Sequence, residues 1–251
     1  MKKLIIIVFP FLISTSFTID YNSLDAKDNL RIKPLFNPQN ESIEYYRKHI
    51  NRAFSLLKKQ KKKIDLELNK NEKAHILSVA FPEMLRYDSY SDYLETSSNR
   101  VLYVNEGKNA SDFSTGYFQI KPSFLEDLEN YVAITESLKQ YNWILIQKKN
   151  ETEVRKERIK RLANFQWQLR YLKVFWYVAE YKFQNIDFKT TEDKIRFFAT
   201  AYNYGFTKPE KEITKYQSAK KFSPEETNTR KFAFSDFSID FIKTYSYFLD
   251  Q

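Results

Sequence analysis

Glycine is scarce in this chain, which has only three in 251 residues, and few other residues enter left-handed turns readily. Gly107 lies in the turn-like run NEGKN, Gly116 lies in STGYFQIKPSF, and Gly205 closes the run AYNYG. A chain so poor in glycine is expected to place each one for a reason. The runs around Gly116 and Gly205 are therefore the first places to look for a functional site.

Apolar residues recur at helical spacing along most of the chain. The pattern predicts helices over 41–69, from Asn71 as N-cap to Leu85, over Pro122–Tyr131, over 151–183, over 190–204 with Thr191 as cap, and over 236–249. Pro82 is expected to kink or end the second of these. Residues 88–113 lack a clear period, apart from a short extended piece at 101–104. The sequence thus predicts a mostly α fold with little or no β-sheet.

The first residues have the pattern of an export signal. Lys2 and Lys3 precede an apolar run from Leu4 to Ile13, and small residues follow it. This predicts a signal peptide over 1–16 that is removed on export, and a periplasmic or secreted protein. An uncleaved N-terminal anchor is the alternative. No later segment is long and apolar enough to cross a membrane.

Composition excludes several chemistries. The chain has no cysteine, so it has neither disulfides nor thiolate-based zinc sites, and its two histidines, His49 and His75, lie far apart. We therefore expect no metal and no cofactor. The formal net charge of +9 favours contact with an anionic polymer of the cell envelope, although scattered lysines also serve as solvated helix faces. No nucleic-acid recognition motif is present, and we expect no such partner.

Three short runs follow one another along the chain. The first is SVAFPEMLRYD, where Glu83 follows Pro82 beside the apolar face of a predicted helix. The second is STGYFQIKPS, with Gly116 and Gln119. The third is ATAYNYG, with Asn203 near its end. Each run alone occurs often by chance, whereas their order and helical settings together are much more specific.

In this order the three runs resemble the soluble lytic transglycosylase family, which belongs to the lysozyme-like superfamily and has goose-type lysozymes as cousins. In that family a catalytic glutamate ends a helix, a segment of the type G-L-M-Q-I-x-P-x-T follows, and a later helix ends in A-Y-N-x-G. The resemblance covers roughly 72–206 and implies a lysozyme-like helical domain there. The remainder would be an N-terminal leader and helix over 17–71 and a C-terminal helical extension over 207–251.

The resemblance also implies an activity and a set of site residues. It implies a peptidoglycan lytic transglycosylase that cleaves the MurNAc–GlcNAc bond with Glu83 as both acid and base, and with peptidoglycan strands as the partner. Tyr202 would orient Glu83 through a hydrogen bond. Gly116 would let the backbone approach the sugar. The expected substrate-binding residues are Gly116, Tyr117, Gln119, Tyr202 and Asn203.

Two departures from the family pattern keep other functions open. Met84 stands where the family usually has serine, and the separation between Glu83 and Gly116 is longer than in the family. One alternative is a catalytically silent glycan-binding or scaffold protein on the same fold. Another is a lysozyme-type hydrolase with a second carboxylate, for which Glu95 is a candidate because ordinary glycosidases use a pair of acids.

Overall fold

A computed structural model describes the backbone of residues 42–87, 89–224 and 231–245. Side chains are described for 47–87, 97–224 and 231–243. The predicted signal peptide over 1–16 and the leader that follows it lie outside these residues. All described residues belong to one compact unit, Pro34–Gln251.

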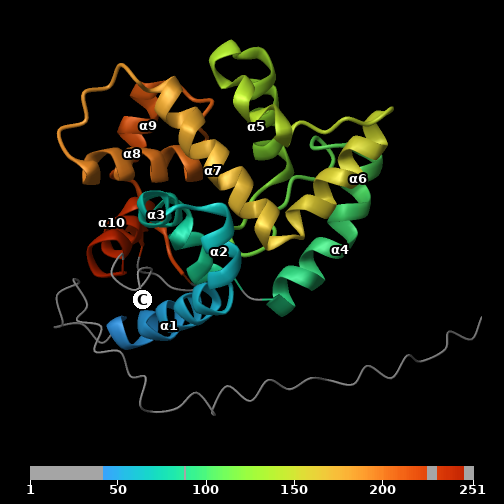
Figure 1. Ribbon diagram of the computed structural model, residues 1–251. Helices are drawn as coiled ribbons and strands as arrows, with labels where there is room; N and C mark the ends of the chain where they lie inside the picture. Colours follow the sequence, from blue (N-terminus) through green and yellow to red (C-terminus); the bar gives the residue numbers. More distant parts are fainter. Residues whose placement is uncertain (1–41, 88, 225–230, 246–251) are drawn as a thin grey trace, which may run out of the picture. The chain divides into compact units, whose positions relative to one another are not determined.

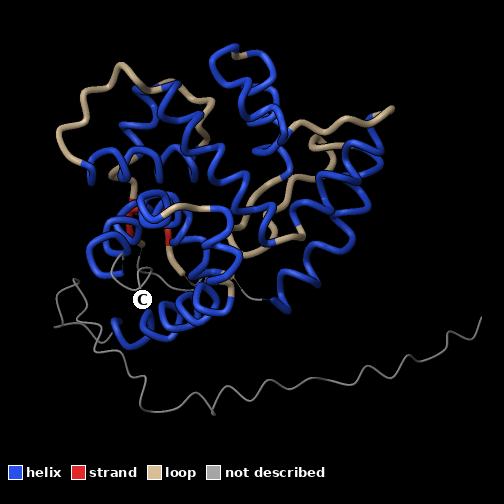
Figure 2. Tube along the Cα trace, in the orientation of Figure 1, coloured by secondary structure: helices blue, strands red, loops and turns tan. Residues whose placement is uncertain are grey.

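The described elements are almost all helices, which confirms the prediction of a mostly α fold (Figures 1 and 2). In chain order they are α1 (Ser42–Lys59), α2 (Lys61–Glu67), α3 (Lys70–Arg86), α4 (Ser89–Glu106), α5 (Pro122–Ile134), the 3-10 helix η3 (Glu136–Ile144), α6 (Glu151–Leu162), α7 (Phe165–Lys182), α8 (Thr191–Tyr204), α9 (Glu210–Tyr216), β1 (Lys220–Phe222), β2 (Phe232–Ala233) and α10 (Phe234–Tyr245). Strands β1 and β2 form one short antiparallel pair.

Helix α3 lies at the centre of this arrangement and is buried from Ile76 to Leu85 without interruption. Helices α1, α7, α8 and α10 pack against it. The Phe81 ring lies 4.5 Å from that of Phe241 on α10 and 5.4 Å from that of Phe54 on α1, measured between centroids. Two helices outside the 72–206 range therefore help to build the core around α3.

The boundaries of α3 correct the predicted N-cap and show that Pro82 does not end the helix. Its N-cap is Asn69 rather than Asn71, because Asn69 forms a reciprocal capping box with Glu72. Pro82 lies inside the helix, which continues to Arg86. Proline removes one backbone hydrogen bond, and packing against four neighbouring helices holds the turn in place nonetheless.

The largest error of the sequence-based prediction concerns residues 88–113, most of which form α4. The expected extended piece at 101–104 is helical, with Tyr103 fully buried while Val101 and Leu102 are exposed. Contacts from distant residues hold this helix. Arg155 on α6 donates to the carbonyl oxygens of Val104 and Asn105, at 2.9 and 3.0 Å, and so satisfies acceptors at the end of α4.

Two long predicted helices are each broken in two. The one over 41–69 breaks at Gln60, between α1 and α2. The one over 151–183 breaks between α6 and α7, where the Asn164 side chain accepts from the Trp167 backbone N–H at 3.1 Å and starts a new helix. The helix predicted from Pro122 is confirmed as α5. The helix over 190–204 is confirmed as α8, with Thr190 as its cap instead of Thr191.

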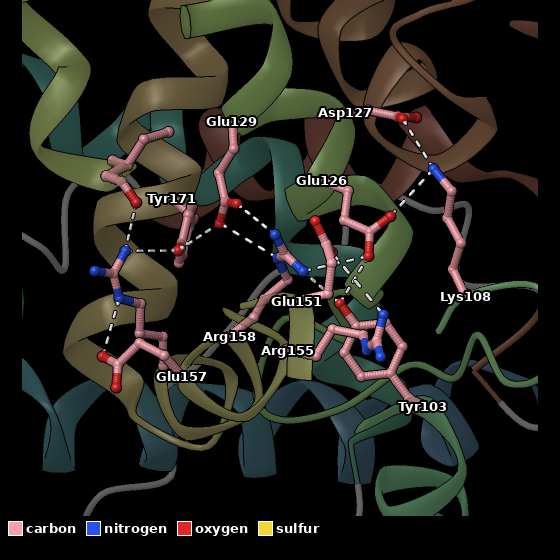
Figure 3. A network of polar contacts seen from close by, with 12 residues as sticks. Tyr103, Lys108, Glu126, Asp127, Glu129, Glu151, Arg155, Glu157, Arg158 and Tyr171 are labelled. Atoms are coloured by element: carbon pink, nitrogen blue, oxygen red, sulfur yellow. Dashed lines mark hydrogen bonds and ion pairs between the residues drawn. The ribbon is translucent and has the colours of Figure 1, made fainter. Parts of the chain in front are cut away.

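A buried polar network joins α4, α5, α6 and α7 (Figure 3). Arg158 donates to both carboxylate oxygens of Glu129, at 2.7 and 3.4 Å, and to the Tyr103 hydroxyl at 2.6 Å. Tyr171 donates to the same Glu129 carboxylate at 3.0 Å. Burial alone would lower the pKa of Arg158, but the bonds and charge of Glu129 raise it. The network keeps a buried charge pair fully bonded and fixes the mutual positions of four helices.

We predict that Arg158→Met lowers the free energy of unfolding by about 3–5 kcal/mol, because it leaves the buried Glu129 carboxylate without its cation. Lys139→Met is the control, since Lys139 pairs with Glu136 on an exposed surface and should cost at most about 1 kcal/mol. Urea unfolding followed by circular dichroism measures both. Equal losses in the two variants would contradict a stabilising role for the network.

Candidate functional site

Glu83 lies one turn before the end of α3, with only 9% of its surface exposed. Among the residues whose side chains are described, none forms a hydrogen bond with its carboxyl group. Burial raises the pKa of Glu83 to about 7, and the nearby charges of Arg86 and Lys121 act in the opposite direction. Near neutral pH this carboxyl is therefore divided between its protonated and ionised forms, a state that suits both proton donation and proton acceptance.

Tyr202 on α8 lies close to Glu83. Burial, and then the charge of Glu83, raise the pKa of the Tyr202 hydroxyl well above its usual value. This hydroxyl donates its single proton to the carbonyl oxygen of Phe118 at 2.7 Å. The bond implied by the resemblance, from Tyr202 to Glu83, is thus replaced by one that ties α8 to the segment around Phe118. The Tyr202 oxygen keeps its capacity to accept a proton donor.

The segment around Phe118 is a tight turn whose ends are paired. Thr115 and Ile120 exchange backbone hydrogen bonds at 3.1 and 3.2 Å. Gly116 has a φ of +76° and Gln119 a φ of +47°, so both adopt the left-handed conformation. For a residue other than glycine this conformation is strained. The side-chain amide of Gln119 donates to the Gly116 carbonyl oxygen at 2.9 Å and so closes the turn.

Residue 116 must be glycine because its backbone lies against the Gln168 side chain on α7. A Cβ atom at residue 116 would lie 1.9 Å from the Gln168 side-chain nitrogen. Gln168 is fully buried, donates to the Leu162 carbonyl oxygen at 2.5 Å, and accepts from the Phe118 backbone N–H at 3.3 Å. The space on the Cβ side of Gly116 is thus filled by Gln168, which gives this glycine a packing role; its approach to a saccharide stays a prediction.

Sequence reasoning missed Gln168. It lies on the inward face of α7 between Phe165 and Leu169, both of which are buried. A glutamine at an inward helical position must find partners, because a buried amide without hydrogen bonds is costly. A glutamine at this inward position was therefore the sequence signal that could have indicated a buried polar contact.

Tyr117 belongs to an aromatic group with Tyr87, at the end of α3, and Phe165, at the start of α7. Its ring stacks on that of Tyr87 at 4.7 Å between centroids and meets Phe165 edge-on at 4.9 Å. Tyr87 caps α3 and donates its backbone N–H to the Glu83 carbonyl oxygen. The structure therefore brings Tyr117 to the end of the helix that carries Glu83.

The remaining predicted residues lie less centrally. Asn203 is exposed in the last turn of α8, directly after Tyr202 and before the capping Gly205. Met84 is fully buried. Glu95 belongs to α4, where only its backbone is described. The structure thus gathers Glu83, Tyr202 and the turn from Thr115 to Ile120, with Asn203 at the margin.

The described residues show no group of three or more acids and histidines placed to hold a metal ion. Over the same part of the chain, no helix has the length and apolar character needed to cross a bilayer. Comparison of the chain with protein-family models, with curated proteins and with solved structures gave no match. What the site can do follows from its own chemistry: a buried carboxyl whose pKa is raised to about 7, with two cations and a tyrosine near it.

We predict that Gly116→Ala destabilises the fold by at least about 2 kcal/mol more than Gly107→Ala. Both glycines have positive φ, so both substitutions carry a backbone cost of about 1–2 kcal/mol. At Gly107 the nearest atom to an added Cβ lies at 3.6 Å, so only Gly116→Ala adds a steric clash. Thermal unfolding measures the difference.

The Gln168→Ala background provides the control for this comparison. With the Gln168 side chain removed, the cost of Gly116→Ala should fall to that of Gly107→Ala, because contacting residues are not additive. If the Gly116→Ala cost stayed the same in both backgrounds, the contact with Gln168 would not be its cause.

We predict that Glu83→Gln becomes more stabilising, relative to wild type, as pH rises. The pKa of Glu83 is raised to about 7 in the folded chain from 4.5, so wild type loses stability as pH rises between these values. The loss amounts to about 3 kcal/mol and is complete above the folded pKa. Glutamine does not titrate. Urea unfolding at about pH 4 and about pH 8 should show a mutant-minus-wild-type difference that grows by this amount; a constant difference would mean that Glu83 is not held in an apolar environment.

Proposed function

We propose that the chain is an exported enzyme that cleaves peptidoglycan glycan strands as a lytic transglycosylase, with Glu83 as its acid and base. The observation that carries the proposal is the Glu83 carboxyl itself. It is nearly buried, has no hydrogen-bond partner among the described side chains, and has a pKa of about 7. Its neighbours, Tyr202 and the Thr115–Ile120 turn, come from the two other runs on which the family resemblance rests.

In the first step, the protonated Glu83 carboxyl would donate its proton to the glycosidic oxygen. The bond between the MurNAc C1 atom and that oxygen breaks, and the GlcNAc-bearing strand leaves with a new hydroxyl group. A carboxyl donates best when its pKa lies near the working pH. The substrate's own N-acetyl group would stabilise the positive charge that develops at C1.

In the second step, the Glu83 carboxylate would take the proton of the MurNAc 6-hydroxyl. The oxygen so released bonds to C1 and closes a 1,6-anhydro ring, so no water is consumed and Glu83 returns to its protonated form. One carboxyl thus replaces the pair that a hydrolase needs. Arg86 and Lys121 favour the carboxylate form required between the two steps.

A silent glycan-binding protein is the second candidate. Met84 is fully buried where the family usually has a serine hydroxyl, and the Tyr202 proton is given to Phe118 instead of Glu83. Both observations leave the Glu83 carboxyl with fewer polar contacts than the resemblance implies. Such a protein would bind peptidoglycan through the same residues and release no product.

Release of soluble muropeptides from purified sacculi tests the proposal. Glu83→Gln keeps the size of the side chain and removes its titrating proton, so the rate should fall by about 100-fold or more while sacculus binding is retained. Glu95→Gln is the matched control, because a transglycosylase keeps its activity in this variant and a two-carboxylate hydrolase loses it. Wild-type rates in Glu83→Gln would exclude Glu83 as the acid. Binding without release by the unmodified chain would favour the silent protein.

A further inference from the structure

Arg86 occupies the last turn of α3, three residues after Glu83, so the two side chains are neighbours on one face of the helix. Phe222 of strand β1 and Ser223, which directly follows the strand, hold the Arg86 side chain at two points. Its Nε atom donates to the Ser223 carbonyl oxygen at 2.9 Å, and its guanidinium carbon lies 4.2 Å from the centroid of the Phe222 ring. These contacts fix the position of a long cation whose charge acts on the candidate acid.

The platform beneath Arg86 is itself rigidly packed. The Phe222 ring meets Phe234 edge-on at 5.1 Å and Phe237 at 5.4 Å, and both lie on α10. Helix α10 in turn packs against α3. Side-chain contacts therefore connect α3 to β1, β1 to α10, and α10 back to α3. Both β1 and α10 belong to the C-terminal region, beyond the three runs of the resemblance.

We propose that Arg86 is a positioning residue for Glu83, and that Phe222 and Ser223 hold its guanidinium in place so that it stabilises the Glu83 carboxylate. The mechanistic value of this arrangement rests on the proposed function, since only the base step needs the carboxylate. The C-terminal region from Lys220 onward is then part of the construction of the site.

The other ionisable groups near Glu83 stabilise its carboxylate less than Arg86 does. Lys121, at the N-cap of α5, also favours the carboxylate, but its side chain is half exposed and lies 3.8 Å from the Asp112 carboxylate. Water and Asp112 therefore weaken its effect. Tyr202 faces Glu83 from α8 and is neutral, because its pKa is raised. Arg52 on α1 donates to the Leu85 carbonyl oxygen at 2.8 Å, and it is not among the charges that shift the pKa of Glu83.

The sign of the effect follows from these charges. Burial raises the pKa of Glu83, and Arg86 is the largest opposing influence. An opposite charge that is close and partly shielded from water lowers the pKa of a carboxyl by about one unit or more. Removal of the guanidinium should therefore raise the pKa of Glu83 further and delay formation of the carboxylate.

Titration of the Glu83 carboxyl by ¹³C NMR tests the proposal in the full chain, with the resonance assigned from its loss in Glu83→Gln. Arg86→Gln should raise the midpoint by about one pH unit. Arg86→Lys keeps the positive charge but lacks the guanidinium that donates to Ser223. Phe222→Leu keeps Arg86 but removes the aromatic ring on which its guanidinium lies. Each of these two should raise the midpoint by a smaller amount. Arg155→Gln is the matched control, because Arg155 also donates to backbone carbonyls but acts on α4, and it should leave the midpoint unchanged.

A purely structural role for Arg86 would lower the unfolding temperature of Arg86→Gln and leave the Glu83 midpoint where it is, and this result would overturn the proposal. If Arg86→Gln does not fold, an unchanged midpoint in both Arg86→Lys and Phe222→Leu would overturn it equally. The titration needs no substrate. A shifted midpoint together with full activity of Glu83→Gln would keep the positioning role and exclude the proposed function.

Discussion

Burial of the Glu83 carboxyl on α3 is the interaction that determines the chemistry of the candidate site. An ionised carboxylate is strongly disfavoured in an apolar environment, and here no described side chain hydrogen-bonds to it. The surrounding helices create this environment, since α3 is buried from Ile76 to Leu85 and four other helices pack on it. The packed helices thus enclose one carboxyl whose pKa is raised by burial.

Two buried glutamates in this chain show how the surroundings decide what a carboxyl does. Glu129 is 6% exposed and accepts hydrogen bonds from Arg158 and Tyr171, so it connects its own helix to two others. Glu83 is 9% exposed and has no such partners among the described side chains. The first arrangement stabilises the fold, whereas the second costs stability above neutral pH and leaves a proton available for transfer.

The sequence was sufficient where local signals agree, and insufficient where distant contacts decide. Helices α5 and α8 follow from their apolar period and flanking residues. The expectation that Glu83, Tyr202 and the Gly116 turn lie together came from the family resemblance of the three runs. Helix α4 could not be predicted, because Arg155 from α6 satisfies its last carbonyl groups. The role of Gly116 likewise depends on Gln168, which lies far along the chain and carries no local signal at residue 116.

The central claim is that the fold raises the pKa of Glu83, so that the carboxyl is still partly protonated at neutral pH. The direct measurement is the titration midpoint of the Glu83 carboxyl in the wild-type chain, followed by ¹³C NMR without substrate. The account predicts a midpoint at about 7. A midpoint near 4.5, the ordinary value for glutamate, would show that water reaches the carboxyl freely, and the case for Glu83 as a general acid would fail.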